Sequence, residues 1–127
     1  MPELPEVETT VRSLNILKNK KVINLDIYTK KLRYQVPLSK LKILNNNILM
    51  NIRRISKYII LDFYNSYTLI IHLGMSGRLK LLNKNTYKVK HDHIIFQFNK
   101  NYFLIYNDPR KFGFVDIVKT NKIHELS

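Results

Sequence analysis

Residues 93–106 read HIIFQFNKNYFLIY and carry the clearest structural signal in the chain. Two apolar runs, His93–Phe98 and Tyr102–Tyr106, flank the polar triplet Asn99-Lys100-Asn101. β-branched and aromatic residues favour strands, and asparagine tolerates the left-handed backbone of a tight turn. The stretch therefore predicts a β-hairpin and, with it, an antiparallel sheet.

Similar runs recur on both sides of this hairpin, separated by Asn, Lys, Gly and Ser. They predict strands at Val22–Tyr28, Ile48–Arg54, Tyr58–Tyr64, Tyr67–Leu73, Arg78–Leu82 and Phe114–Val118. Helical spacing, with Pro5 in the first turn, predicts a helix over residues 5 to about 18, and Pro37–Leu44 carries a weaker helical pattern. We expect a mainly β (α+β) fold. Its core would be an antiparallel β-sandwich or flattened pseudobarrel of about eight strands, flanked by an N-terminal helix and a second short helix.

The chain is short and strongly basic. Its 127 residues predict one domain with a single core. The 22 Lys and Arg exceed the 9 Asp and Glu, which gives a formal charge of +13. Such an excess favours a polyanionic partner, with nucleic acid first and an anionic membrane surface second. No apolar run approaches the roughly 20 residues that a membrane span needs, so we expect a cytoplasmic protein without a membrane anchor.

The chemistry of the side chains narrows the possible sites. The chain has no cysteine, which excludes a disulfide, a thiol nucleophile and a Cys-ligated metal within these residues. The histidine pair His91 and His93, two apart on an expected strand, supplies too few ligands for a metal site. We therefore expect no metal in these 127 residues.

The amino terminus places acidic residues beside a proline. Glu3, Glu6 and Glu8 lie within the first eight residues, and removal of Met1 would expose Pro2 as a secondary amine. Amino-terminal amines titrate at about 7.7–8.0, so a neutral fraction exists near pH 7 that can attack an aldehyde-level carbon. The same residues also suit a rigid, capped helix start. From the residues alone, both interpretations stay open.

Five motifs in order resemble the formamidopyrimidine-DNA glycosylases, bacterial enzymes that excise oxidised purines. The motifs are MPELPEVET at residues 1–9, RRISKY at 53–58, HLGMSG at 72–77, KHDH at 90–93 and DPRKFG at 108–113. Together they are far more specific than any one of them, and they extend over essentially the whole chain. There are two mild departures. Lys111 replaces a second arginine of many relatives, and Ser56 lies where a small residue varies.

The resemblance implies base-excision repair by a bifunctional DNA glycosylase and abasic-site lyase. Pro2 would attack C1′ of a flipped nucleotide, such as 8-oxoguanine or a formamidopyrimidine, and form a Schiff base before β-elimination. Glu3 matches the acid that assists opening of the sugar ring, and Lys57 matches the proton donor in β-elimination. Glu6 matches a glutamate near the nucleophile that orients it or holds the helix start.

The resemblance also implies a set of DNA-binding residues. Met75, Arg110 and Phe112 match three side chains that fill the space left by the flipped nucleotide, with Arg110 facing the orphaned cytosine. Without the motifs, a buried Met and Phe and an Arg in a turn would be the simpler interpretation. Asp108-Pro109 nevertheless predicts an exposed loop tip.

Further positions are implied to lie near the DNA backbone. His72, His91 and Lys111 correspond to such positions, and Arg54 and Lys90 extend the expected phosphate-binding surface. His93 is equally consistent with a structural histidine within a strand.

The resemblance predicts how the chain is organised. Residues 1–118 correspond to the N-terminal catalytic domain. Residues 119–127 are polar, are expected to form no closing element, and correspond to the start of an interdomain linker. Relatives continue into a helix–two-turn–helix domain and a zinc finger. Their one zinc belongs to that part, so no cofactor is expected here. We expect a monomeric fragment of low activity that binds double-stranded DNA containing an oxidised purine or an abasic site, with weak, mostly electrostatic binding of ordinary duplex.

Two other interpretations remain open. The sister endonuclease VIII-type branch acts on oxidised pyrimidines but usually has glycine at the position of Leu4. A non-enzymatic basic β-barrel would bind single strands through aromatic residues gathered on one exposed sheet face. Phe96, Phe98, Phe103 and Tyr106 lie inside apolar runs and are instead expected in the core.

Overall fold

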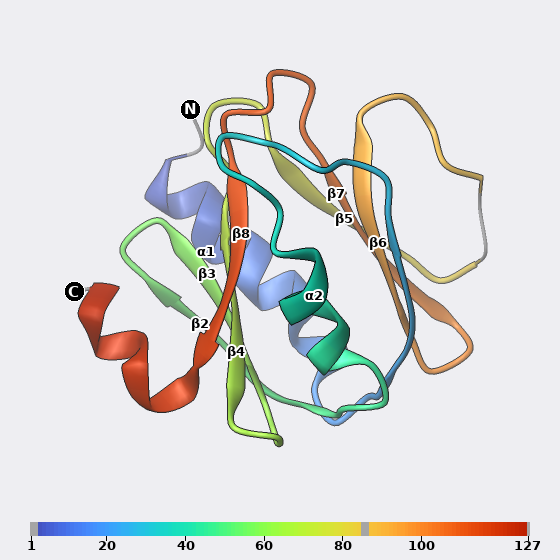
Figure 1. Ribbon diagram of the computed structural model, residues 1–127, viewed down its shortest axis with the longest axis vertical. Helices are drawn as coiled ribbons and strands as arrows, with labels where there is room; N and C mark the ends of the chain where they lie inside the picture. Colours follow the sequence, from blue (N-terminus) through green and yellow to red (C-terminus); the bar gives the residue numbers. More distant parts are fainter. Residues whose placement is uncertain (1–2, 85–86, 127) are drawn as a thin grey trace.

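The computed structural model describes residues 3–84 and 87–126, and Pro2 therefore lies outside the described residues. Within these ranges the chain forms two four-stranded antiparallel sheets (Figure 1). One has the order β1-β6-β7-β5, with β1 Val22–Ile27, β5 Arg78–Leu82, β6 Asp92–Phe98 and β7 Tyr102–Asn107. The other has the order β2-β3-β4-β8, with β2 Leu49–Ile55, β3 Tyr58–Phe63, β4 Tyr67–His72 and β8 Phe114–Lys119. The predicted fold class and all of the predicted strands are confirmed.

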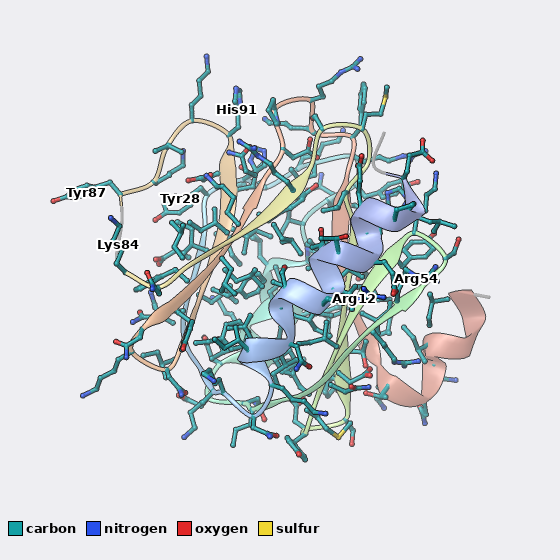
Figure 2. All side chains as sticks on the ribbon, turned by 180° about the vertical axis from the view of Figure 1, so that it is seen from behind. Arg12, Tyr28, Arg54, Lys84, Tyr87 and His91 are labelled. Carbon is teal, nitrogen blue, oxygen red and sulfur yellow. The ribbon has the colours of Figure 1, made fainter. Side chains whose placement is uncertain are left out.

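Helices cover the two sides that the sheets leave open. Figure 1 shows α2 on the near side of the sandwich and α1 on the far side, and the reverse view in Figure 2 brings α1 to the front. Helix α1 spans Leu4–Ser13 and continues as the 3₁₀ turn η1, Leu14–Leu17, so the predicted helix of residues 5–18 is α-helical only in its first part. The weaker pattern forms α2, Leu38–Leu41, and the 3₁₀ turn η2, Lys42–Leu44.

The core lies between the sheets and is closed by the helices. Val7 of α1 and Leu41 of α2 contribute to the same buried cluster as Phe96, Phe98 and Tyr106. These three aromatic side chains are where the sequence predicted them. Phe103 is also buried, but it packs on the outer face of its sheet with Ile95 and Ile105. This pattern does not support an exposed aromatic face on β6 and β7.

The last segment is more ordered than the sequence predicted. Residues Thr120–Leu126 form the 3₁₀ helix η3 rather than ending without an element. The Thr120 amide donates to the Ser66 carbonyl oxygen at 2.8 Å, and its hydroxyl donates to Thr68, whose own proton goes to buried Asp62. This series of hydrogen bonds holds the segment against β3 and β4. The polar sequence of the segment does not by itself indicate such bonds.

Among residues 3–84 and 87–126, no helix is both long and apolar enough to cross a membrane.

Candidate nucleic-acid interface

Two loops meet at one end of the sandwich. In Figure 1 the loop between β4 and β5 and the loop between β7 and β8 lie at the same end, near the start of α1. Their backbones touch at Gly74, where φ is +59° and an added Cβ would lie 2.5 Å from the Gly113 nitrogen and the Phe112 carbonyl carbon. Only glycine fits such a position without strain. The sequence thus allows a closer approach of the loops than side chains would permit.

The predicted void-filling residues converge on this end of the molecule. Met75 on the first loop is 47% exposed, and Phe112 on the second is 43% exposed. The Arg110 guanidinium lies 4.8 Å from the centroid of the Phe112 ring and 3.8 Å from the Met75 sulfur. The simpler expectation of a buried Met and Phe is therefore wrong, and the predicted exposed loop tip is confirmed for Arg110 and Phe112.

An open cavity of about 710 Å³ lies against the two loops. Part of its wall is apolar, and three cations also line it, whereas no carboxylate does so among the residues that the structure describes. The apolar lining residues are Leu32, Met75 and Phe112, the cations are Arg33, Arg110 and Lys111, and His72 and Gly74 complete the wall. Apolar wall and uncompensated positive charge together suit a ligand that has both flat bases and phosphates.

The segment before α2 completes the cavity, and its role was not predicted from the sequence. The Arg33 amide donates to the Gly113 carbonyl oxygen at 3.1 Å, and its guanidinium lies 5.6 Å from the centroid of the Tyr34 ring. The Tyr34 ring in turn packs edge-on against Phe114, with centroids 5.1 Å apart. In the sequence, the cations and the aromatic residue of Lys31-Leu32-Arg33-Tyr34 are the one signal that could have indicated this part of the site.

His72 also lines the cavity and belongs to a small aromatic cluster. Its ring stacks on Phe114 with centroids 5.3 Å apart, and the Tyr58 ring packs edge-on against it at 5.2 Å. Its Nδ1 accepts a hydrogen bond from the Gly74 amide at 3.1 Å, which fixes the proton of the neutral ring on Nε2. Burial lowers the pKa of His72, and the positive charges of Arg33 and Lys57 lower it further. The neutral form of His72 therefore predominates at pH 7.

We predict that His72 titrates below its ordinary pKa of 6.5. Because the folded state disfavours the protonated ring, this residue makes a contribution to stability that is present above pH 6.5 and is lost as the pH falls below 6.5 and through the lower pKa of the folded state. Replacing Arg33 by glutamine should raise the pKa towards 6.5, whereas replacing exposed Lys100 should not change it. NMR titration of the ring protons measures both values. An unchanged pKa in Arg33→Gln would contradict the assigned cause.

Of the predicted catalytic residues, Glu3 and Glu6 lie at the start of α1 and Lys57 lies between β2 and β3, whereas Pro2 lies outside the described residues. Glu3 precedes α1, and its amide donates to the Glu6 carboxylate at 3.4 Å, so Glu6 holds the helix start. Lys57 is the second residue of the two-residue turn between β2 and β3, after Ser56 in the left-handed region at φ +52°. Lys57 directly precedes Tyr58, which pairs with His72 across β3 and β4, and the positive charge of Lys57 contributes to the lowered pKa of His72.

The predicted phosphate-binding surface is not continuous. Arg54 pairs with Glu8 of α1 at 3.0 Å, and Figure 2 shows it beside α1, well away from His91 at the start of β6. Lys111, in contrast, lines the cavity. His93 is buried, with Nδ1 2.6 Å from the Thr29 hydroxyl and Nε2 2.7 Å from the Asp108 carbonyl oxygen. Its interpretation as a structural histidine is confirmed.

No group of three or more His, Asp and Glu side chains capable of holding a metal ion occurs in the described part of the chain.

Comparison with known proteins gives a consistent result. Residues 1–115 match the family model for the formamidopyrimidine-DNA glycosylase N-terminal domain. Over 98% of the chain, the sequence is 51% identical to a formamidopyrimidine-DNA glycosylase of Rickettsia canadensis, and the match covers 46% of that relative. A relative of the same name from Wolbachia pipientis is 42% identical over the whole chain, again covering 46% of its length.

Solved structures agree with the sequence matches. The fold superposes on the Lactococcus lactis glycosylase bound to DNA containing N7-benzyl-Fapy-dG, with a TM-score of 0.89 and 33% identity over 98% of this chain and 46% of that one. The same enzyme bound noncovalently to DNA with an abasic site gives a TM-score of 0.89 at 31% identity, over 98% and 48% of the two chains. The chain spans about half the length of these relatives. It belongs to the formamidopyrimidine-DNA glycosylase family and corresponds to that family's N-terminal domain.

Proposed function

We propose that this chain serves base-excision repair as the N-terminal part of a DNA glycosylase with abasic-site lyase activity. The observation that carries the proposal is the grouping of exposed Met75, Arg110 and Phe112 beside a cavity lined by cations. A planar cation and two apolar side chains can replace the stacking and pairing of a nucleotide that has left the duplex. The proposed substrate is double-stranded DNA with an oxidised purine or an abasic site.

The proposed reaction begins at the amino terminus. The neutral Pro2 amine attacks C1′, the bond from C1′ to the damaged base breaks, and the base leaves with a proton. Ring opening, assisted by proton transfer from Glu3 to the sugar oxygen, gives an iminium between Pro2 and C1′. A proton then passes from C2′ to water, the bond from C3′ to the phosphate oxygen breaks in β-elimination, and the Lys57 ammonium donates a proton to the departing phosphate.

The charge distribution supports a nucleic-acid partner. Arg33, Arg110 and Lys111 surround the cavity, and the whole chain carries a formal charge of +13. Phosphates of a duplex would displace their own counterions when they bind this surface, so affinity should fall as salt rises. We propose that the chain binds DNA as a monomer.

A trapping experiment tests the proposal. We expect a chain with a free Pro2 to form a covalent adduct with a duplex carrying one abasic site when borohydride is present, because borohydride reduces an iminium to a stable amine. Peptide mapping should place the adduct at Pro2. A matched chain with an N-terminal extension that blocks Pro2 should give only the background of a reaction without protein. Absence of an adduct from the trimmed, folded chain would refute lyase chemistry in this domain, and an adduct on a lysine would refute the role of Pro2.

A further inference from the structure

A fully buried carboxylate organises the loop between β7 and β8. Asp108 has no exposed surface. Its Oδ2 accepts hydrogen bonds from the Tyr106 hydroxyl at 2.7 Å and the Gly113 amide at 2.9 Å, and its Oδ1 accepts from the Lys111 amide at 3.2 Å. Asp108 therefore holds its own loop on both sides of Phe112.

The same carboxylate also reaches the other loop. The Ser76 hydroxyl donates to Asp108 Oδ1 at 2.7 Å, and the Ser76 oxygen accepts a hydrogen bond from the Arg110 amide at 3.0 Å. Ser76 follows Met75 directly, so one hydroxyl connects the loop that carries Met75 with the loop that carries Arg110 and Phe112. A hydrogen bond to a charged group is about twice as strong as one between neutral groups.

We propose that Ser76 and Asp108 are positioning residues that join the two loops, so that Met75, Arg110 and Phe112 enter the duplex as one unit. This inference rests on the proposed function, because it concerns how DNA is entered. Neither residue touches the reacting atoms. Their effect is exerted through the loops that they connect.

The physical reason is the cost of ordering. Met75 and Phe112 are each about half exposed and lie on separate loops, so each would lose side-chain and loop freedom on entering a base stack. When the loops are already joined, that cost is met during folding rather than during binding. The contacts of Arg110 with Met75 and Phe112 are long and exposed, so they cannot replace the shorter bond from Ser76 to the buried carboxylate.

A double-mutant cycle tests the link. The ligand is a duplex with a tetrahydrofuran abasic analogue opposite cytosine, and a 2-aminopurine beside the analogue reports binding by its fluorescence. The cycle compares the Kd of the variants Met75→Ala and Phe112→Ala with the Kd of the double variant. We expect coupling of about threefold or more in the otherwise unchanged chain, and no coupling in the Ser76→Ala background. Ser13→Ala, at an exposed serine of α1 whose hydroxyl donates to the Thr10 carbonyl oxygen of the same helix, is the matched control and should leave the coupling unchanged.

A measurement without DNA separates this inference from the proposed function. In the free chain, Ser76→Ala should increase the motion of both the Met75 methyl group and the Phe112 ring in NMR relaxation, whereas Ser13→Ala should increase neither. Unchanged motion, or coupling that persists in Ser76→Ala, would overturn the inference. If the abasic duplex binds no better than an undamaged one, the proposed function fails, while the relaxation result still decides whether the loops are linked.

Discussion

Replacing Lys57 by methionine is expected to slow β-elimination by about 10²–10⁴-fold while Schiff-base formation continues. The proposed role of Lys57 is proton transfer after the iminium has formed, so its loss should affect only the later step. Methionine keeps the unbranched apolar stem and removes the ammonium. On a duplex with one abasic site, borohydride should still trap the adduct, and strand cleavage without borohydride should nearly disappear.

Two controls make this result specific. Lys119→Met removes a positive charge from the exposed end of β8 and should change neither the amount of trapped adduct nor the rate of strand cleavage. In Lys57→Met itself, the pKa of His72 should rise but stay below 6.5, because burial and Arg33 still lower it, and a value below 6.5 reports that the surroundings of His72 remain folded. A parallel loss of adduct and cleavage would contradict the assignment and would place Lys57 in DNA binding or in formation of the iminium.

The sheets could be predicted because their signal is local. In β3, Ile59 and Leu61 face the core, and β4 repeats the pattern with Leu69 and Ile71. Runs of this kind, separated by turn residues, define strands without knowledge of their partners. Helix boundaries were less accurate. Leu14 and Leu17 keep helical spacing and are fully buried, but the chain tightens there into 3₁₀ turns, which hydrophobic spacing does not distinguish from an α-helix.

The site could be predicted only in part because its geometry depends on long-range contacts. The motif resemblance selected Met75, Arg110 and Phe112, and the structure places them together. It did not select Arg33, which reaches the cavity because its backbone bonds to Gly113, eighty positions later. Arg54 shows the opposite case: it lies within a matching motif but pairs with Glu8. Such pairings follow from packing between elements distant in sequence, which residue spacing does not encode.

The largest effect on stability is expected at Asp108. Replacing it by alanine should lower the free energy of unfolding by about 3–5 kcal/mol, because removing one partner of a buried charged network leaves the remaining polar groups without water or acceptors. The Tyr106 hydroxyl, the Ser76 hydroxyl and the Gly113 amide would all lose their acceptor. Burial, the hydrogen bond to Asp108 and the charge of Asp108 raise the pKa of Tyr106 well above its usual value, so Tyr106 stays a donor at any physiological pH.

Asp116 provides the matched control for this variant. It lies on β8, is only partly buried, and accepts a hydrogen bond from the neighbouring Ile117 amide at 2.8 Å. Asp116→Ala should change the free energy of unfolding by no more than about 0.5 kcal/mol. Urea unfolding at pH 7 measures both variants. Equal small losses in the two variants would show that water can replace the Asp108 carboxylate. Asp108 would then hold the β7–β8 loop no more firmly than an ordinary surface turn is held. A large loss confined to Asp108→Ala would mean instead that the loop carrying Arg110 and Phe112 is anchored by the same buried carboxylate that stabilises the fold.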